Sequence, residues 1–353
     1  SAAGDGRRVW RLDWFDAGVL GVLALASLVF LAVLAIHGGE WTGVEGFIGS
    51  HLADGLIARG DEVTIFDNLS SGREENLAGA LDEGANLVLG DINDYPALEA
   101  SVADSRPDVI FHLAAQGEVR KSIEEPVFDA ASNVVGTVNV LEAARRFSTK
   151  RVVFASTGGA IYGEGSRIEL PADESALLAP LCPYGQSKLA AEGYLDLYRR
   201  MYGLSSAALR FANVYGPRQN PKGEAGAVAI FGDLLMRGER PTIFGDGTQT
   251  RDFIYIDDLI EGVLAASTAS VEGPVNLGSG EETSLVELLQ ILAEATSALN
   301  RESPVETIEP IFGEPRPGEV KRICISPDRA REFLDWSPKV LIEDGLLRTL
   351  RTL

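Results

Sequence analysis

The stretch TGVEGFIGS (residues 42–50) decides which fold the rest of the chain can adopt. Its glycines stand at positions 43, 46 and 49, and the periodicity of the next residues predicts a helix over 47–59. A strand is predicted over 62–66, and it ends in Asp67. Glycines let the backbone approach a pyrophosphate, and the amino end of a helix favours that anion. The order of turn, helix, strand and acid predicts a dinucleotide-binding unit, although a lone glycine pattern can also be an ordinary loop.

Asp67 also indicates which dinucleotide would bind. An acid at the end of the second strand suits the ribose hydroxyls of NAD and repels the additional phosphate of NADP. NAD is therefore the cofactor that the residues favour.

Apolar strands and helices alternate further along the chain. Strands are predicted over 86–89, 108–112, 151–154 and 206–211, and a long helix over 127–146. This alternation predicts a parallel sheet with helices on both faces, whose ligands bind at the carboxyl ends of the strands. Turn chemistry alone is the other explanation for each small residue there. We expect these ends to bring together Gly43, Asp67, Asp91, Ala114 and Thr157.

The segment PYGQSK (183–188) opens another predicted helix and contains a candidate catalytic pair. Tyr184 and Lys188 are four residues apart, which places both side chains on one helix face. An ammonium group beside a phenol lowers the pKa of the phenol, so that it can exchange a proton with a substrate hydroxyl. A chance spacing is the alternative when the pair is considered alone.

Composition excludes several classes of function. The 353 residues carry a net charge of −21, which repels a nucleic-acid backbone. Cys182 and Cys324 are far apart and predict neither a disulfide framework nor a metal site. The three histidines are scattered, so we expect no catalytic metal.

The first 41 residues differ in character from the rest of the chain. An uncharged apolar run of 20 residues spans 17–36, which is long enough for a membrane helix, and three arginines precede it. The alternative is that its last part, 30–36, is a buried parallel strand, because such strands are also continuously apolar. By length, a membrane helix or hydrophobic anchor is the favoured interpretation.

A family resemblance rests on several motifs along the chain. From about Thr42 to the C-terminus, the sequence resembles the extended short-chain dehydrogenase/reductases of the NAD-dependent epimerase/dehydratase family, and it looks most like their UDP-glucose (UDP-galactose) 4-epimerases. The motifs are TGVEGFIGSHL (42–52), FDNLSSG (66–72), FHLAAQ (111–116), ASTGGAIYG (155–163), PYGQSK (183–188), RFANVYGPRQ (210–219) and TRDFIYIDD (250–258).

The resemblance implies an α/β fold, with a Rossmann-like doubly wound parallel sheet and a smaller C-terminal α+β lobe for the substrate. It assigns 42–175 to the NAD-binding domain, with parts of 184–215 and 252–280, and 176–353 to the UDP-sugar lobe; 1–41 is left as the apolar segment. It also implies a homodimer through the helices at 127–146 and 184–202. The expected location is the cytoplasm, with a membrane contact through 17–36 if that run is an anchor.

The resemblance also assigns residues. Thr157, Tyr184 and Lys188 would be catalytic. The substrate diphosphate would meet Asn213, Arg251 and Arg316, although an ion pair with Asp252 or a neighbouring acid is the alternative role of Arg251. The residues expected to contact NAD are Gly43, Gly46, Phe47, Ile48, Asp67, Asn68, Asp91, Ile92, Ala114, Tyr184 and Lys188.

The implied reaction is epimerisation at C4 of the sugar. Tyr184 would take the proton of the 4-hydroxyl while the hydride passes to NAD, and Thr157 would orient the reacting oxygen. The 4-keto sugar would then turn over and receive the hydride on its other face. Gly158 and Gly159 stand where the related dehydratases have an Asp-Glu pair, which counts against dehydration.

The first glycine turn departs from the family pattern. Val44 and Glu45 replace its usual small residues, and an anionic Glu45 beside a pyrophosphate would weaken NAD binding. Two alternatives therefore stay open: an enzyme for another nucleotide sugar, and a catalytically silent binding protein whose first strand is missing.

Overall fold

A computed structural model describes residues 28–32, 45–70, 74–221, 226–299, 309–316 and 318–353. Within these residues, seven parallel strands form the central sheet, in the order β11-β6-β5-β4-β1-β2-β3. The strands are β1 (Leu28–Ala32), β2 (Glu62–Asp67), β3 (Asn86–Leu89), β4 (Val109–His112), β5 (Arg151–Thr157), β6 (Ser205–Phe211) and β11 (Gly273–Leu277). The predicted parallel α/β fold is confirmed, and the predicted strands agree with β2 to β6 to within a few residues.

Strand β1 corrects the interpretation of the N-terminal apolar run. It lies between β2 and β4, and Val29 is the register partner of both Val63 and Val109. The prediction of a membrane helix over 17–36 is therefore wrong at 28–32, where the chain forms a strand instead. This strand begins two residues before the predicted strand at 30–36. A strand with parallel neighbours on both sides is apolar throughout, so its sequence can be mistaken for part of a membrane helix. The rest of the run lies outside the described residues, among which no helix is both long and apolar enough to span a bilayer.

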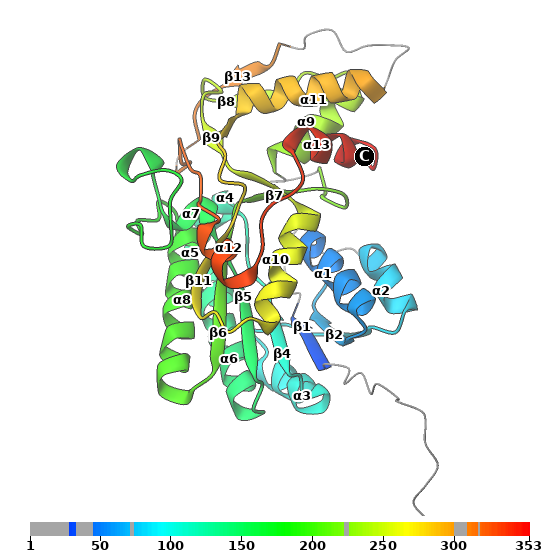
Figure 1. The fold of residues 1–353 in the computed structure, drawn as a ribbon, viewed down its shortest axis with the longest axis vertical. Helices are drawn as coiled ribbons and strands as arrows, with labels where there is room; N and C mark the ends of the chain where they lie inside the picture. Colours follow the sequence, from blue (N-terminus) through cyan, green and yellow to red (C-terminus); the bar gives the residue numbers. More distant parts are fainter. Residues whose placement is uncertain (1–27, 33–44, 71–73, 222–225, 300–308, 317) are drawn as a thin grey trace, which may run out of the picture.

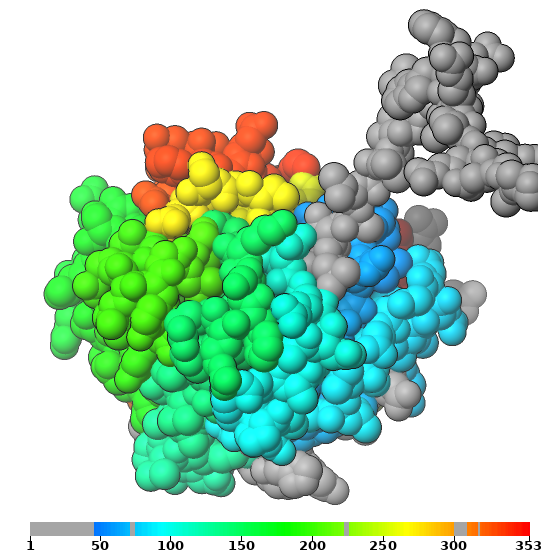
Figure 2. Space-filling view, turned by 90° about the horizontal axis from the view of Figure 1, so that it is seen from below, coloured from blue at the N-terminus to red at the C-terminus, as the bar shows by residue number. Residues whose placement is uncertain are grey.

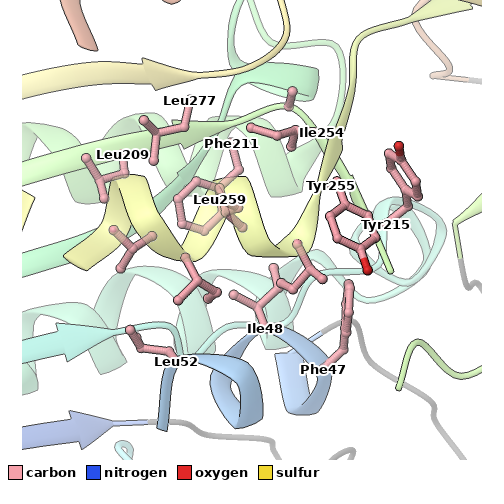
Figure 3. Packing of buried hydrophobic residues seen from close by; sticks show 14 of the residues in the cluster. Phe47, Ile48, Leu52, Leu209, Phe211, Tyr215, Ile254, Tyr255, Leu259 and Leu277 are labelled. Carbon is pink, nitrogen blue, oxygen red and sulfur yellow. The ribbon is translucent and has the colours of Figure 1, made fainter. Parts of the chain in front are cut away.

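Helices cover both faces of the sheet (Figure 1). On one face lie α1 (Glu45–Arg59) and α10 (Ile256–Thr268); on the other lie α3 (Tyr95–Ser105), α6 (Gly136–Arg146) and α8 (Pro183–Tyr202). Burial in β5 alternates as a strand requires: Val153 packs in the cluster of α1 and α10, whereas Val152 and Phe154 pack in the cluster of α3, α6 and α8. Figure 3 shows the first cluster, to which α1 contributes Leu52 and α10 contributes Leu259.

The helix predicted over 127–146 is divided. It consists of α5 (Pro126–Ala130), one π-helical turn (Ala131–Val135) and α6. Asn133 lies in that turn, where its side chain binds the backbone of Gln116 instead of facing solvent. Single π-turns inside helices often accompany functional sites.

A smaller group of elements lies beyond the carboxyl ends of the strands, at the top of Figure 1. Its helices α9 (Ala227–Met236), α11 (Leu285–Leu299) and α13 (Ile342–Leu350) pack through residues such as Phe231, Leu292 and Leu346. Its short strands pair as β7 (Asn213–Tyr215) with β10 (Phe253–Tyr255), β8 (Thr242–Phe244) with β13 (Ile311–Gly313), and β9 (Thr250–Arg251) with β12 (Thr283–Ser284). The remaining helices are α2 (Ala78–Asp82), α4 (Val119–Glu124), α7 (Gly158–Ile161) and α12 (Asp328–Leu334).

The position of β1 can be tested with proline. Leu31 pairs with Ile65 on one side and Phe111 on the other, so its amide hydrogen faces a neighbouring strand in either direction. We expect Leu31→Pro to lower the free energy of unfolding by at least about 2 kcal/mol, because it leaves a buried carbonyl without its donor. Chemical denaturation followed by circular dichroism measures the change.

The matched control is Leu89→Pro in edge strand β3. There the amide of Gly90 donates to Asp67 O at 3.0 Å, so the amide of Leu89 faces the open edge. This variant should lose much less stability, and equal losses in the two variants would contradict the central position of β1.

Candidate functional site

The carboxyl ends of β2 and β3 bring three predicted residues together. Asp67 ends β2 and is buried, and its Oδ1 accepts a hydrogen bond from Leu69 N at 2.7 Å. Asn68 Nδ2 donates to Asp91 Oδ2 at 3.2 Å. Asp91 is held in turn by the amide of Asn93, which donates to its Oδ1 at 2.8 Å. The two acids and the amide therefore form an ordered polar group at the strand ends, as the sequence predicts.

The first turn of α1 supplies amide groups to the same edge. Phe47 and Ile48 are buried, and their side chains point into the cluster under α10 (Figure 3). Their side chains are therefore turned away from a ligand at this edge, and Gly46 has no side chain. The backbone amides remain available, because the first amides of a helix have no partner inside it. The turn at 42–44, with Gly43 and Val44, lies outside the described residues.

Ile92 and Ala114 prove to be core residues. Both are buried in the cluster of α3, α6 and α8. Their side chains therefore belong to the hydrophobic core next to the carboxyl ends of the strands.

Lys188 and Thr157 are positioned by helix α8 and strand β5. The Lys188 ammonium donates to Ala155 O at 2.9 Å, and it lies 4.7 Å from the centre of the Phe154 ring and 5.9 Å from that of Tyr184. Lys188 is buried, and Thr157, two residues beyond Ala155, is buried too. The predicted pair thus stands on one face of α8 against the end of β5.

Thr157 and Asn213 border the same space. A Cβ atom built on Gly159 would lie 3.9 Å from Thr157 Oγ1 and 3.5 Å from Asn213 Oδ1, so both polar atoms point to the side that this glycine leaves open. The backbone of Asn213 is held in place by its N–H group, which donates to Asp252 O at 2.8 Å. The start of β7 therefore lies at the same edge as Thr157, where β5 ends.

Arg251 has an acidic partner, but it is not Asp252. Its Nη2 lies 3.1 Å from Glu319 Oε1, and its Nη1 donates to Thr250 O at 2.8 Å. Burial lowers the pKa of Arg251 from its usual value, and the Glu319 carboxylate opposes that effect. Asp252 instead accepts the amide hydrogen of Ile325 at 3.2 Å, together with those of Ser279 and Gly280.

Arg316 lies on the same segment as Glu319. It is exposed, and its guanidinium carbon stands 3.9 Å from the centre of the Phe244 ring. A guanidinium that lies over an aromatic ring can still direct the N–H donors in its own plane at an anion. The segment 309–319 therefore carries one of the predicted arginines and the partner of the other.

Asp129 is a residue that the sequence analysis missed. It is fully buried beside α8, and its Oδ2 accepts from Ser187 Oγ at 2.6 Å. Its Oδ1 accepts from Gln116 Nε2 at 3.0 Å and from Asn133 Nδ2 at 2.9 Å. Burial raises the pKa of Asp129, while these donors and the Lys188 charge oppose the rise. The sequence does contain a signal for this residue, because Asp129 is an acid among the apolar residues of PVFDAA (126–131) in a predicted helix.

His112 is a buried neutral group at the end of β4. Thr137 Oγ1 donates to Asn133 O at 2.7 Å and lies 2.9 Å from His112 Nε2, so Nε2 carries the hydrogen. Burial, and then the charge of Lys188, lower the pKa of His112 to about 3. This histidine stays neutral at physiological pH and cannot act as an acid there.

Comparison with known proteins identifies the family. The model of the NAD dependent epimerase/dehydratase family matches residues 42–278. This chain belongs to that family. It is 43% identical over 311 residues to UDP-glucose 4-epimerase of Mycolicibacterium smegmatis, a match that covers 88% of this chain and 96% of that protein.

Two crystal structures of epimerases share the fold. The UDP-glucose 4-epimerase of Thermotoga maritima, solved with UDP-glucose, has a TM-score of 0.82 and 40% identity, covering 92% of this chain and 98% of its own. The Thermus thermophilus enzyme, solved with NAD, has a TM-score of 0.80 and 38% identity over the same shares.

NAD is the cofactor of this epimerase family, and the residues present fit it. Asp67 offers a buried carboxylate to ribose hydroxyls, and the first turn of α1 offers amides to a pyrophosphate. Lys188 offers an ammonium beside the end of β5, where a nicotinamide ribose would lie.

The lowered pKa of His112 predicts a pH dependence of stability. The unfolded histidine binds a proton near pH 6.5 and the folded one only near pH 3, so stability is lost as the pH falls through this window. Between pH 7 and pH 5 the loss from this group should be about 2 kcal/mol.

His112→Gln tests this, because glutamine offers Thr137 a polar group without titrating. Urea unfolding at the two pH values should give a smaller difference for the variant than for the natural chain. Equal differences would show that His112 does not contribute.

Proposed function

We propose that this chain interconverts UDP-glucose and UDP-galactose by NAD-dependent 4-epimerisation. The observation that carries the proposal is the arrangement of Tyr184 and Lys188 on α8, where Lys188 binds Ala155 O two residues before Thr157 at the end of β5. Similarity to UDP-glucose 4-epimerases over most of the chain supports the choice of sugar. The cytoplasm is the compartment that we propose, because it holds both NAD and nucleotide sugars.

The proposed chemistry is divided between three side chains. Tyr184 removes the proton of the sugar 4-hydroxyl and returns it, and Lys188 favours the phenolate form by its nearby positive charge. Thr157 donates a hydrogen bond that orients the reacting oxygen. NAD, when bound, takes up a hydride and gives it back, so that no net oxidation occurs.

Asn213, Arg251 and Arg316 are proposed to hold the diphosphate. Asn213 opens onto the space beside Thr157, Arg316 lies on the segment 309–319, and Arg251 is paired with Glu319 of that segment. An arginine fork donates two hydrogen bonds to phosphate oxygens. In this proposal the diphosphate replaces Glu319 as the partner of Arg251.

Packing at Gly158 counts against the dehydratase alternative. A Cβ there would lie 2.6 Å from Ile325 Cδ1 and 3.2 Å from Phe211 O, so an aspartate would require the Ile325 side chain to move. Gly159 has room for a side chain, and the space that it leaves open also suits another UDP-sugar. The sugar is therefore the part of the proposal that the assay must settle.

Tyr184→Phe tests the reaction. We expect the variant to convert UDP-galactose to UDP-glucose about 10²- to 10⁴-fold more slowly, because it lacks the group that moves the proton. The assay uses purified protein with and without added NAD, and cofactor fluorescence checks that NAD binding is kept. An unchanged rate would contradict the role of Tyr184. A natural chain that binds NAD but converts neither sugar would point to another substrate, and one that binds no NAD to a silent protein.

Arg251→Met tests the diphosphate site. Because hydrogen bonds to charged groups contribute about 1.5–3 kcal/mol, KM for the UDP-sugar should rise by roughly 10- to 100-fold. The matched control is Glu319→Gln, which removes the ion pair of Arg251 but keeps the arginine. Its KM should not rise. If both variants raise KM equally, the ion pair matters and the diphosphate contact does not.

We also propose a homodimer through α5, α6 and α8. These helices lie side by side, and Figure 2 shows part of the surface that they form. Val127 is 82% exposed and Val135 is 53% exposed, and Met201 and Tyr202 are exposed at the end of α8. Large apolar side chains that are exposed along a group of adjacent helices are what a protein interface would cover.

Light scattering tests the dimer. We expect a mass near twice 37.7 kDa at micromolar concentration. Val135→Glu should shift the protein towards the monomer, since it introduces charges into the contact. Leu341→Glu is the control, because Leu341 is 68% exposed but lies beside α13. A monomeric natural chain would rule out the dimer.

A further inference from the structure

A buried ion pair links α8 to the central sheet. Arg210, on β6, donates from Nε to Glu192 Oε1 at 3.0 Å and from Nη2 to Glu192 Oε2 at 2.7 Å. The two side chains are only 2% and 10% exposed. Two parallel hydrogen bonds of this kind fix the direction as well as the distance between the partners.

The same carboxylate is bound by the neighbouring strand. Ser156 Oγ donates to Glu192 Oε1 at 2.6 Å, and Ser156 is the register partner of Arg210 across β5 and β6. Arg210 is itself held by the hydroxyl of Tyr162, which accepts from Nη1 at 2.8 Å. Glu192 therefore reaches from α8 to two adjacent strands at one level of the sheet.

Stability alone is a weak explanation for this arrangement. Taking an ion pair out of water costs about as much as the attraction returns, and apolar replacements are often no less stable. The cluster thus calls for a role in which geometry matters more than energy.

Its place on α8 suggests that role. Glu192 lies four residues after Lys188, which lies four residues after Tyr184, so the three side chains follow one face of the helix. Lys188 binds Ala155 O and Glu192 binds Ser156, and Thr157 is the next residue on β5. The helix is therefore joined to two successive residues of the strand that ends in Thr157.

We propose that Ser156, Glu192 and Arg210 form a positioning unit, which we call the α8 anchor, that sets the rotation and register of α8 against β5 so that Tyr184 and Lys188 meet Thr157. The anchor rests on the proposed function, because it is assigned to the same three catalytic residues. None of its members touches the reacting atoms. Without it, α8 keeps its apolar packing but loses its fixed register.

The test replaces the pair by apolar residues in Glu192→Leu/Arg210→Met. We expect a folded protein with a melting temperature close to that of the natural chain, a kcat lower by on the order of 100-fold, and a KM that changes little. Ser156→Ala, which removes a single hydrogen bond, should lower kcat by less. Glu192→Asp keeps the charge but shortens the reach, so it should stay folded and also lose kcat.

The matched control is Arg151→Met at the other end of β5. Arg151 is a buried arginine as well, and its Nε donates to Ala266 O at 2.9 Å. We expect this variant to lose stability without losing kcat, because it lies at the end of the strand away from Thr157. The anchor would be overturned if Arg151→Met lost as much kcat as Glu192→Leu/Arg210→Met, because the loss would then follow from damage to β5 in general.

A substrate-free measurement separates the anchor from the proposed function. Ionisation of Tyr184 is followed by ultraviolet difference spectra against Tyr184→Phe. In Glu192→Leu/Arg210→Met the midpoint of the Tyr184 ionisation should move to higher pH, because the phenol loses its fixed position beside the Lys188 ammonium. Asp129 and His112, the other titratable groups beside Lys188, are the same in both proteins. An unmoved titration overturns the anchor, whereas a natural chain that is inactive on UDP-sugars counts only against the proposed function.

Discussion

The hydrogen-bond ladder between β1 and its two neighbours is the constraint on which the rest of the structure depends. β1 is the strand that joins β2 and β3 to β4, β5, β6 and β11 in one sheet. Because every pair in that sheet is parallel, all strands end at the same edge, and Asp67, Ala114 and Thr157 meet there without being close in sequence. A chain without this strand would keep the residues but not their common edge.

Two buried polar groups then hold α8 against that edge. Asp129 binds Ser187 from the side of the π-turn, and Glu192 binds Ser156 and Arg210 one turn further along. Lys188, which we propose to be catalytic, lies between them on the helix. Buried groups that are fully hydrogen-bonded make a region rigid, and here both surround the residues that must keep a fixed geometry.

Much of this arrangement could be predicted from the sequence, for identifiable reasons. The strands β2 to β6 and the residues at their ends follow from periodicity and turn chemistry, which act locally. The strand β1 was misread because a fully buried parallel strand and a membrane helix share one composition. The roles of Asp129 and Arg210 escaped prediction because their partners are far away in the chain: Ser187 lies 58 positions from Asp129, and Tyr162 lies 48 from Arg210. Such pairs become visible only when the sheet has brought them together.

The late position of β11 has a consequence for how the protein folds. This strand pairs with β6, yet the chain between them builds β7, β8, β9, α9 and α10. The sheet therefore cannot be completed until the chain has passed through much of the smaller lobe, and the two parts cannot fold one after the other as separate units. Closing such long loops for parallel strands slows folding, because their entropy is lost before the contacts form. On the ribosome, an emerging chain would expose the edge of β6 until residue 277 had been made, and this is the period in which it would depend most on chaperones.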